Sequence, residues 1–228
     1  MDALWLILSP IESAMRIFLV LAHSFTGDFG VAIILLSLTV RVLTAPIAAL
    51  AARSQERARS VQAAMAPELA RIRATSTGRE RFERTEALYK LHGYHPIHSV
   101  KALLPLFLQI PFLIAAFFLL SDFAPLAGER FLVIPDLLRP DGLVTLGGIE
   151  INILPLLITA IVLMESAIRT GGEAGDRFRF LLVALVIAVL IYPATAAVCL
   201  YWLTTNLLSL ARAAAKRFTN GAAREQSA

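Results

Sequence analysis

Arg41 is the residue whose chemistry is hardest to reconcile with its surroundings. It lies near the middle of an apolar stretch, Phe29–Leu50, that contains no other charged residue. If this stretch crosses a bilayer, an arginine at its centre costs about 2.5–3.5 kcal/mol and must face a bundle interior or a wet cavity. There it would supply a permanent positive charge. The alternative is a buried ion pair with Glu165, an acid that also lies within an apolar stretch.

Polar side chains accompany Arg41. Ser37 lies four residues before it and Thr44 three residues after it, so the three share one face of a helix. Gln109 lies in a second apolar stretch. A later stretch carries five more polar residues: Tyr201, Thr204, Thr205, Asn206 and Ser209. Each alone is explained by an ordinary hydrogen bond between helices, worth about 0.6 kcal/mol on average. Together with an intramembrane arginine, they predict a hydrophilic groove.

No pattern in the sequence supplies enzyme chemistry. There is no Ser/His/Asp arrangement, no pair of carboxylates within an apolar stretch and no glycine-rich phosphate loop. His92, His95 and His98 are close enough in sequence to suggest a metal site, but Gly93 and Pro96 break any helix that would align them. We therefore expect a protein that is not an enzyme and that holds no metal or cofactor.

The elements that must position these residues are long apolar helices. Hydrophobic residues make up 57% of the chain, the mean hydropathy is +0.71, and runs of about 18 or more apolar residues signal bilayer spans. The predicted spans are 29–50, 102–121, 149–168 and two within 178–211, which Pro193 divides. The part before Pro193 is short for a hydrocarbon core about 30 Å thick. The predicted fold is an all-α integral membrane protein with five transmembrane helices around a hydrophilic groove.

The segments outside these spans have predicted roles of their own. They are an N-terminal amphipathic interfacial helix over 1–28, a cytoplasmic helical hairpin over 51–101, an irregular extracytoplasmic loop over 122–148, a cytoplasmic loop over 169–177 and a cytoplasmic tail over 212–228. In the N-terminal helix, Glu12 and Arg16 share one side; the alternative is a sixth span. In the hairpin, Thr77 and Glu80 form a capping box that opens a second helix, ending near Leu91.

The distribution of basic residues predicts the orientation. Of the 21 Lys and Arg residues, 17 fall in the hairpin, the 169–179 region and the tail, and three fall in the opposite segments. Because basic residues concentrate on the cytoplasmic side, the hairpin and the C-terminus are expected in the cytoplasm and the N-terminus outside. A single helix over 178–211 would export the tail, which the charge pattern disfavours. The basic hairpin also suggests contact with anionic lipids.

Four stretches resemble the core of the YidC-type membrane protein insertases of the YidC/Oxa superfamily. They are GDFGVAIILLSLTVRVLTAPI (Gly27–Ile47), LYKLHGYHPI (Leu88–Ile97), LPLFLQIPFLIAAFF (Leu104–Phe118) and LYWLTTNLLSL (Leu200–Leu210). The resemblance covers nearly the whole chain in the same order. It implies a bacterial inner-membrane protein that inserts or folds client membrane proteins, alone or beside the Sec translocon, through a groove open to the cytoplasm and lipid.

The resemblance also implies roles for individual residues. Arg41 would be the groove arginine, and Ser37 and Trp202 would stand at two further groove positions. Ile110, Pro111 and Leu113 would lie on the span that contacts clients. With the polar residues described above, the expected groove and client-binding set is Arg41, Ser37, Thr44, Gln109, Ile110, Pro111, Leu113, Tyr201, Trp202 and Asn206.

The sequence also departs from the family. His98-Ser99-Val100-Lys101 replaces the glycine pair expected after the hairpin, and there is no large periplasmic domain or long basic tail. Ribosome docking is therefore not expected, and nucleic acid is not an expected partner. The sequence leaves open whether the chain is a housekeeping insertase or a divergent paralogue with few clients. The alternatives are a fixed subunit of a larger membrane complex and, less favoured for lack of inverted repeats, an anion-handling transporter.

Overall fold

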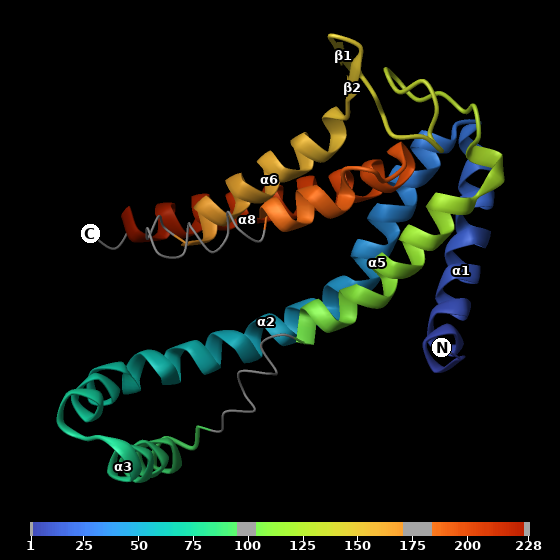
Figure 1. Cartoon of the computed structure of the whole chain (residues 1–228). Helices are drawn as coiled ribbons and strands as arrows, with labels where there is room; N and C mark the ends of the chain where they lie inside the picture. The colour runs from blue at the N-terminus through green and yellow to red at the C-terminus, as the bar shows by residue number, and fades with distance from the viewer. Residues whose placement is uncertain (1, 95–103, 171–183, 226–228) are drawn as a thin grey trace. The chain divides into compact units, whose positions relative to one another are not determined.

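The computed structural model describes residues 2–94, 104–170 and 184–225, which are mostly helical (Figure 1). In chain order the elements are α1 (Asp2–Thr26), α2 (Phe29–Thr75), α3 (Gly78–Leu91), α5 (Leu104–Asp122), the 3-10 helix η1 (Ala124–Leu126), β1 (Val144–Leu146), β2 (Ile149–Ile151), α6 (Ile153–Thr170) and α8 (Ala196–Glu225). The chain divides into two compact units. We call Met1–Arg41 with Phe112–Ala228 the bundle unit, and Val42–Pro111 the hairpin unit.

α2 is one continuous helix of 47 residues. It passes the predicted boundary at Leu50 without a break, because the residues that follow are mainly good helix formers. Its segment Phe29–Ile47 is, among the described helices, the one long and apolar enough to cross a membrane. Gln109–Asp122 and Ile153–Ile168 form shorter apolar helices. Arg41 therefore lies within a helical segment that is long and apolar enough to cross a membrane.

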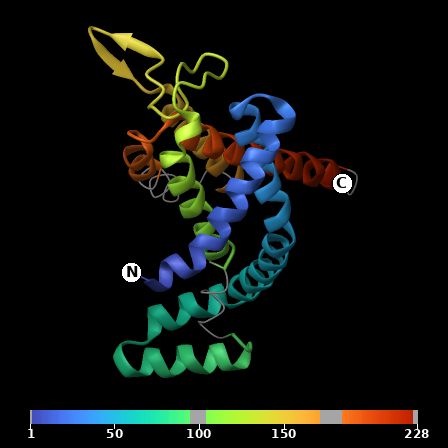
Figure 2. The same ribbon diagram turned by 90° about the vertical axis from the view of Figure 1, so that its right-hand side faces the viewer.

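The core of the bundle unit is built from apolar faces of α1, α2, α5, α6 and α8. Buried members from these helices include Leu19, Ile33, Leu120, Ile158 and Ala197. At one end of this unit α1 turns into α2, α5 ends, and α6 and α8 begin. We call this end the loop end. It lies towards the top of Figure 1, and the β1–β2 hairpin projects from it in both Figure 1 and Figure 2.

Aromatic rings mark the loop end beside α1. The guanidinium of Arg16 lies 5.6 Å from the ring centroid of Phe123, which packs edge-on against Phe29 at 6.0 Å. His23 in turn stacks on Phe29 at 3.7 Å. Arg16 thus lies beside the C-terminal end of α5, and His23 lies beside the start of α2. The Glu12–Arg16 pair expected from the sequence is present at 2.9 Å.

The loop before α6 is more regular than expected. β1 and β2 pair antiparallel through Val144↔Ile151, Thr145↔Glu150 and Leu146↔Ile149. Gly147 and Gly148 make the turn with φ values of +59° and +85°, which glycine adopts without strain. A helix beginning at Ile149 is therefore wrong: residues 149–151 form a strand, and α6 begins at Ile153.

A turn interrupts the last apolar stretch. Residues 184–191 are helical, residues 192–195 are not, and α8 begins at Ala196. Proline cannot donate a backbone hydrogen bond to a continuing helix, so the break falls at Pro193. The described part of the stretch therefore forms two helical segments rather than one.

The hairpin unit pairs the later part of α2 with α3. Met65, Ile72, Leu88 and Tyr94 form its small buried core. α3 begins at Gly78 directly after Thr77, as the predicted capping box requires, but the Thr77 side chain makes no capping hydrogen bond. Instead, Arg81 donates hydrogen bonds to the backbone carbonyls of Ser76 (2.9 Å) and Arg73 (3.0 Å), which tie α3 to the end of α2.

Candidate intramembrane site

Ser37 and Arg41 lie one helical turn apart on the face of α2 that turns towards the bundle core. Ser37 is 1% exposed, and its hydroxyl donates to the carbonyl of Ile34 at 2.8 Å. Arg41 is half-buried, and its Nε atom is buried. The positively charged side chain of Arg41 therefore enters the bundle instead of extending wholly into surrounding lipid.

Tyr201 of α8 lies within electrostatic reach of Arg41. The guanidinium lies close enough to the Tyr201 phenol for its charge to act on that hydroxyl. Tyr201 is only 4% exposed, yet its hydroxyl makes no hydrogen bond to any residue that the structure describes. Arg41 and Tyr201 thus place a positive charge beside a phenol with unused hydrogen-bonding capacity.

The other polar residues of α8 bond to their own helix. Thr204 and Thr205 donate to the carbonyls of Leu200 and Tyr201, both at 2.9 Å. The Asn206 amide donates to the carbonyl of Trp202 at 2.8 Å. Hydrogen bonds between helices therefore do not explain why these three polar residues occur in an apolar stretch. Backbone bonding fixes the Asn206 side chain against α8 and uses only its NH2 group.

Glu165 has a partner on α8. Its Oε1 accepts a hydrogen bond from the Ser209 hydroxyl at 2.6 Å, across the packed pair of helices α6 and α8. Ser209 is thus the polar residue of the last stretch that does bridge two helices. This bond gives the Glu165 carboxylate a neutral donor between α6 and α8.

The remaining predicted site residues divide between the two units. Leu113 and Trp202 are partly buried and pack against the core of the bundle unit. Thr44, Ile110 and Pro111 are half-buried and Gln109 is exposed, and all four belong to the hairpin unit. Within the bundle unit the structure brings together Ser37, Arg41 and Tyr201, followed along α8 by Trp202 and Asn206.

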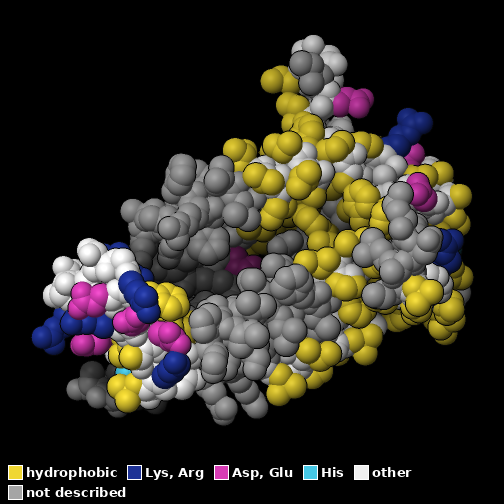
Figure 3. All heavy atoms as spheres, turned by 60° about the horizontal axis from the view of Figure 1, so that its bottom comes forward, with side chains coloured by type: hydrophobic (Ala, Val, Ile, Leu, Met, Phe, Trp, Pro, Cys, Tyr) yellow, Lys and Arg dark blue, Asp and Glu magenta, His cyan; other side chains and the backbone are white. Residues whose placement is uncertain are grey.

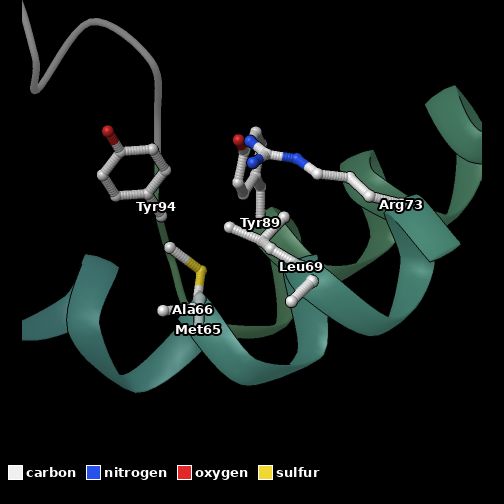
Figure 4. A pocket seen from close by; sticks show the side chains of 7 residues that line it. Met65, Ala66, Leu69, Arg73, Tyr89 and Tyr94 are labelled. Carbon is white, nitrogen blue, oxygen red and sulfur yellow. The ribbon is translucent and has the colours of Figure 1, made fainter. Parts of the chain in front are cut away.

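The hairpin unit contains a hollow of about 330 Å³. Its floor is apolar, from Met65 and Leu69, and its rim carries Tyr89, Tyr94 and Arg73 (Figure 4). Apart from the helical spacing of Val61, Met65, Leu69 and Ile72, nothing in the sequence indicates this hollow. Three of the four basic residues of α3 are paired with acids one turn away: Arg79–Glu83, Arg84–Glu80 and Lys90–Glu86, at 2.7–2.8 Å. Charges of both signs accordingly gather over this unit (Figure 3).

Of the three histidines considered as metal ligands, the structure describes one. The Nδ1 atom of His92 lies 3.1 Å from the carbonyl of Leu88, so that ring caps the end of α3. His95 and His98 lie outside the described residues. Over the described part of the chain, no group of three or more His, Cys, Asp or Glu residues could hold a metal ion.

Sequence reasoning missed a buried polar network at the loop end. Asp141 is 2% exposed, and its carboxylate accepts the backbone N–H groups of Ile153 (2.6 Å) and Leu154 (3.3 Å) at the start of α6. Asn152 accepts from the Gly142 N–H at 3.0 Å and donates to the Tyr192 carbonyl at 2.9 Å. An Asn immediately before an apolar run is a recognised helix-start signal, and here it could have located the start of α6.

The same loop also closes the start of α8. Arg139 and Leu137 offer their carbonyls to the N–H groups of Ala196 (2.7 Å) and Ala197 (2.9 Å). Thr195 adds a side-chain acceptor for Val198 at 3.5 Å. The first N–H groups of a helix have no partner within it. One loop therefore satisfies the starts of two apolar helices.

These features define a class: a helical membrane protein with an arginine inside an apolar span and a cluster of polar residues beside it. The model of the family described as "60Kd inner membrane protein" matches residues 21–220. The chain belongs to this family of inner membrane proteins.

Relatives and a solved structure agree with that assignment. A membrane protein insertase YidC of Chlamydia trachomatis is 28% identical over 222 residues, covering 90% of this chain and 27% of the relative. One of Hahella chejuensis is 28% identical over 211 residues, covering 92% and 34%. The chain thus spans about a third of the length of these curated relatives. The crystal structure of an active YidC insertase shares the fold, with a TM-score of 0.59 at 22% identity over 89% of this chain and 45% of that one.

Proposed function

We propose that this chain is a membrane protein insertase that receives polar segments of client proteins beside Arg41. The observation that carries the proposal is the position of Arg41: a half-buried arginine in an apolar helical segment, one turn from the buried Ser37 and within electrostatic reach of the Tyr201 phenol. A fixed positive charge at that depth lowers the cost of bringing an acidic client segment into the membrane. No nucleotide or cofactor is needed for this step.

The polar residues around Arg41 would solvate the entering segment. The Tyr201 hydroxyl has hydrogen-bonding capacity that no described residue uses, and the Asn206 Oδ1 atom likewise has no partner among the described residues. Ser37 adds a small polar surface. We infer that these groups line a hydrophilic groove. Thr44 and Gln109 are proposed members of it from the sequence alone.

The apolar part of a client would then leave towards lipid along α5 and α8. Leu113 and Trp202 present partly buried apolar surface on these helices, and Ile110 and Pro111 extend the α5 side. Transfer of apolar surface into the bilayer would drive this step. Clients are the proposed partners, with the Sec translocon or a dedicated membrane complex beside them and anionic lipids at the basic hairpin.

We also propose five spans, with the N-terminus outside and the C-terminus in the cytoplasm of a bacterial inner membrane. The 17 basic residues expected on one side, against three on the other, support this orientation. The Glu12–Arg16 ion pair within α1 supports an interfacial helix rather than a sixth span, because charged side chains are costly inside a bilayer.

An insertion assay tests the proposed function. The purified chain is reconstituted into vesicles, and a single-span client with an acidic N-terminal tail is added; the protease-protected fraction measures insertion. Arg41→Ala should lower insertion at least about tenfold, the factor that an attraction of only ~1.4 kcal/mol provides. Arg41→Lys should retain most of it, because a point charge suffices.

The matched control is Arg212→Ala, which removes an exposed arginine from α8. It should insert the client as the parent does, and a client with a neutral tail should depend less on Arg41. Equal insertion by the parent and Arg41→Ala would refute the role of the charge. Co-purification with one constant partner, instead of changing clients, would favour a fixed subunit.

A further inference from the structure

A tight turn over Phe131–Ile134 exposes two large apolar side chains at its tip. Phe131 and Ile134 donate backbone hydrogen bonds to each other's carbonyls at 3.0 and 2.8 Å. The two residues at the base are 8% and 3% exposed, whereas Leu132 and Val133 at the tip are 87% and 74% exposed. Apolar side chains this exposed on adjacent positions indicate a surface that is covered in the working protein.

The turn is held firmly in this unusual form. Leu132 has a φ of +51°, a left-handed conformation that side-chain-bearing residues rarely adopt and that persists only where the surroundings enforce it. Here Phe131 provides the enforcement: its ring packs so closely on Gly30 that a Cβ at Gly30 would lie 2.1 Å from it. The tip is therefore a fixed projection from the start of α2.

The contact with Gly30 sets the depth of the tip. Gly30 is the second residue of the apolar segment Phe29–Ile47, whose 19 residues span about 28 Å, close to the hydrocarbon thickness of about 30 Å. Gly30 thus lies at the hydrocarbon boundary. Two residues of chain reach about 7 Å at most, and the headgroup layer is about 5–8 Å thick on each side. The tip therefore lies within or beside that layer, whichever way the turn points.

A second exposed apolar surface begins at the same level and continues along α1. Ile17, Leu21 and Phe25 recur every four residues along α1 and are 66%, 55% and 83% exposed. Phe25 comes four residues before Phe29, at the same membrane boundary. Aromatic and apolar residues at such a boundary are typical of contact with lipid headgroups and the upper acyl chains.

We propose that the Phe131–Ile134 turn is a lipid anchor, in which Leu132 and Val133 insert between the headgroups of the leaflet at the loop end. The adjoining Arg130 is exposed and can meet a lipid phosphate. The anchor fixes the loop that caps α6 and α8 relative to the bilayer surface. It is independent of the insertase activity, and it requires only that α2 spans the membrane.

Site-directed spin labelling tests the anchor. Single cysteines replace Leu132, Val133 or, as the control on the same loop, the exposed Glu129, each in a Cys199→Ala background. The labelled chains are reconstituted into phosphatidylcholine–phosphatidylglycerol vesicles. For each label, the ratio of its collision rate with oxygen to its collision rate with a water-soluble nickel chelate is measured. This ratio should be several-fold higher at positions 132 and 133 than at position 129.

Two results would overturn the proposal. Nickel accessibility at 132 and 133 equal to that at 129 would place the tip in water, and low accessibility to both reagents would place it against protein. Leu132→Trp serves where the label disturbs the turn. The fluorescence of the new tryptophan is obtained by subtracting the signal of the parent. Lipids brominated near the ester end of their chains should quench it more than lipids brominated near the methyl end. Equal or absent quenching would also refute insertion.

Discussion

Arg41 and Asp141 are two charges in largely buried positions, and the chain stabilises them in different ways. The Asp141 carboxylate accepts backbone N–H groups at the start of α6 and needs no cation. Arg41 instead lies beside a phenol and a buried serine in the middle of a span. The first arrangement is typical of a structural cap, and the second of a group kept for interaction with something that enters.

We expect Arg41 and Glu165 to contribute independently to stability, because Glu165 is engaged by Ser209 between α6 and α8. Thermal unfolding in detergent of Arg41→Ala, Glu165→Gln and the double variant checks this. Arg41→Ala should be as stable as the parent or more so, and the two effects should add. A buried pair would behave differently: each single change would cost about 3–5 kcal/mol by stranding one charge, and the double variant would recover most of that loss.

Asp141→Ala should destabilise the bundle unit by about 1–3 kcal/mol, because it strands two N–H groups at a buried helix start. Asp141→Asn, which keeps one acceptor oxygen, should lose less. The control is Asp136→Ala in the same loop: Asp136 accepts the Leu138 N–H at 2.9 Å, but it is partly exposed. Chemical or thermal unfolding in detergent ranks the three. A loss for Asp136→Ala as large as that for Asp141→Ala would contradict the capping role.

Among the elements, the loop before α6 is the one whose structure was hardest to predict from the sequence. The long helices follow from apolar runs, and the break at Pro193 follows from proline chemistry. The β1–β2 hairpin had a signal, Gly147-Gly148 between alternating apolar residues. That signal was hidden because Ile149 and Ile151 also extend the apolar run of α6. The polar groove residues could be selected by type, but their hydrogen bonds could not, since bonding within α8 or across to α6 depends on side-chain geometry.

Gly30 is a position where α2 and the loop approach each other closely. Gly30→Ala would place a Cβ 2.1 Å from the Phe131 ring, and we expect a loss of about 1–3 kcal/mol from the forced shift. Val31→Ala, on the exposed side of the same turn, should change stability little. In Gly30→Ala/Phe131→Ala the two losses should be less than additive, measured by unfolding in detergent. Full additivity would show that the two residues do not meet.

For the whole molecule, the proposed orientation of both termini rests on one charge asymmetry. Single cysteines at Ser76, Gly142 and Ser227 of a Cys199→Ala variant report the side of each segment. An impermeant thiol reagent added outside intact cells should label position 142 alone, since basic segments remain in the cytoplasm. Labelling all three after the cells are opened shows that each cysteine can react. Labelling of position 227 in intact cells would reverse the proposed topology.

The loop that caps two helices also implies an order of assembly. Leu137, Arg139 and Asp141 precede both α6 and α8 in the chain, so their acceptor groups emerge from the ribosome before the N–H groups they will bind. Each later helix can therefore dock its first turn onto a template that has already been synthesised. A chain that stops before Ala196 leaves two loop carbonyls without their donors. Synthesis of the last helix is thus the event that closes the fold.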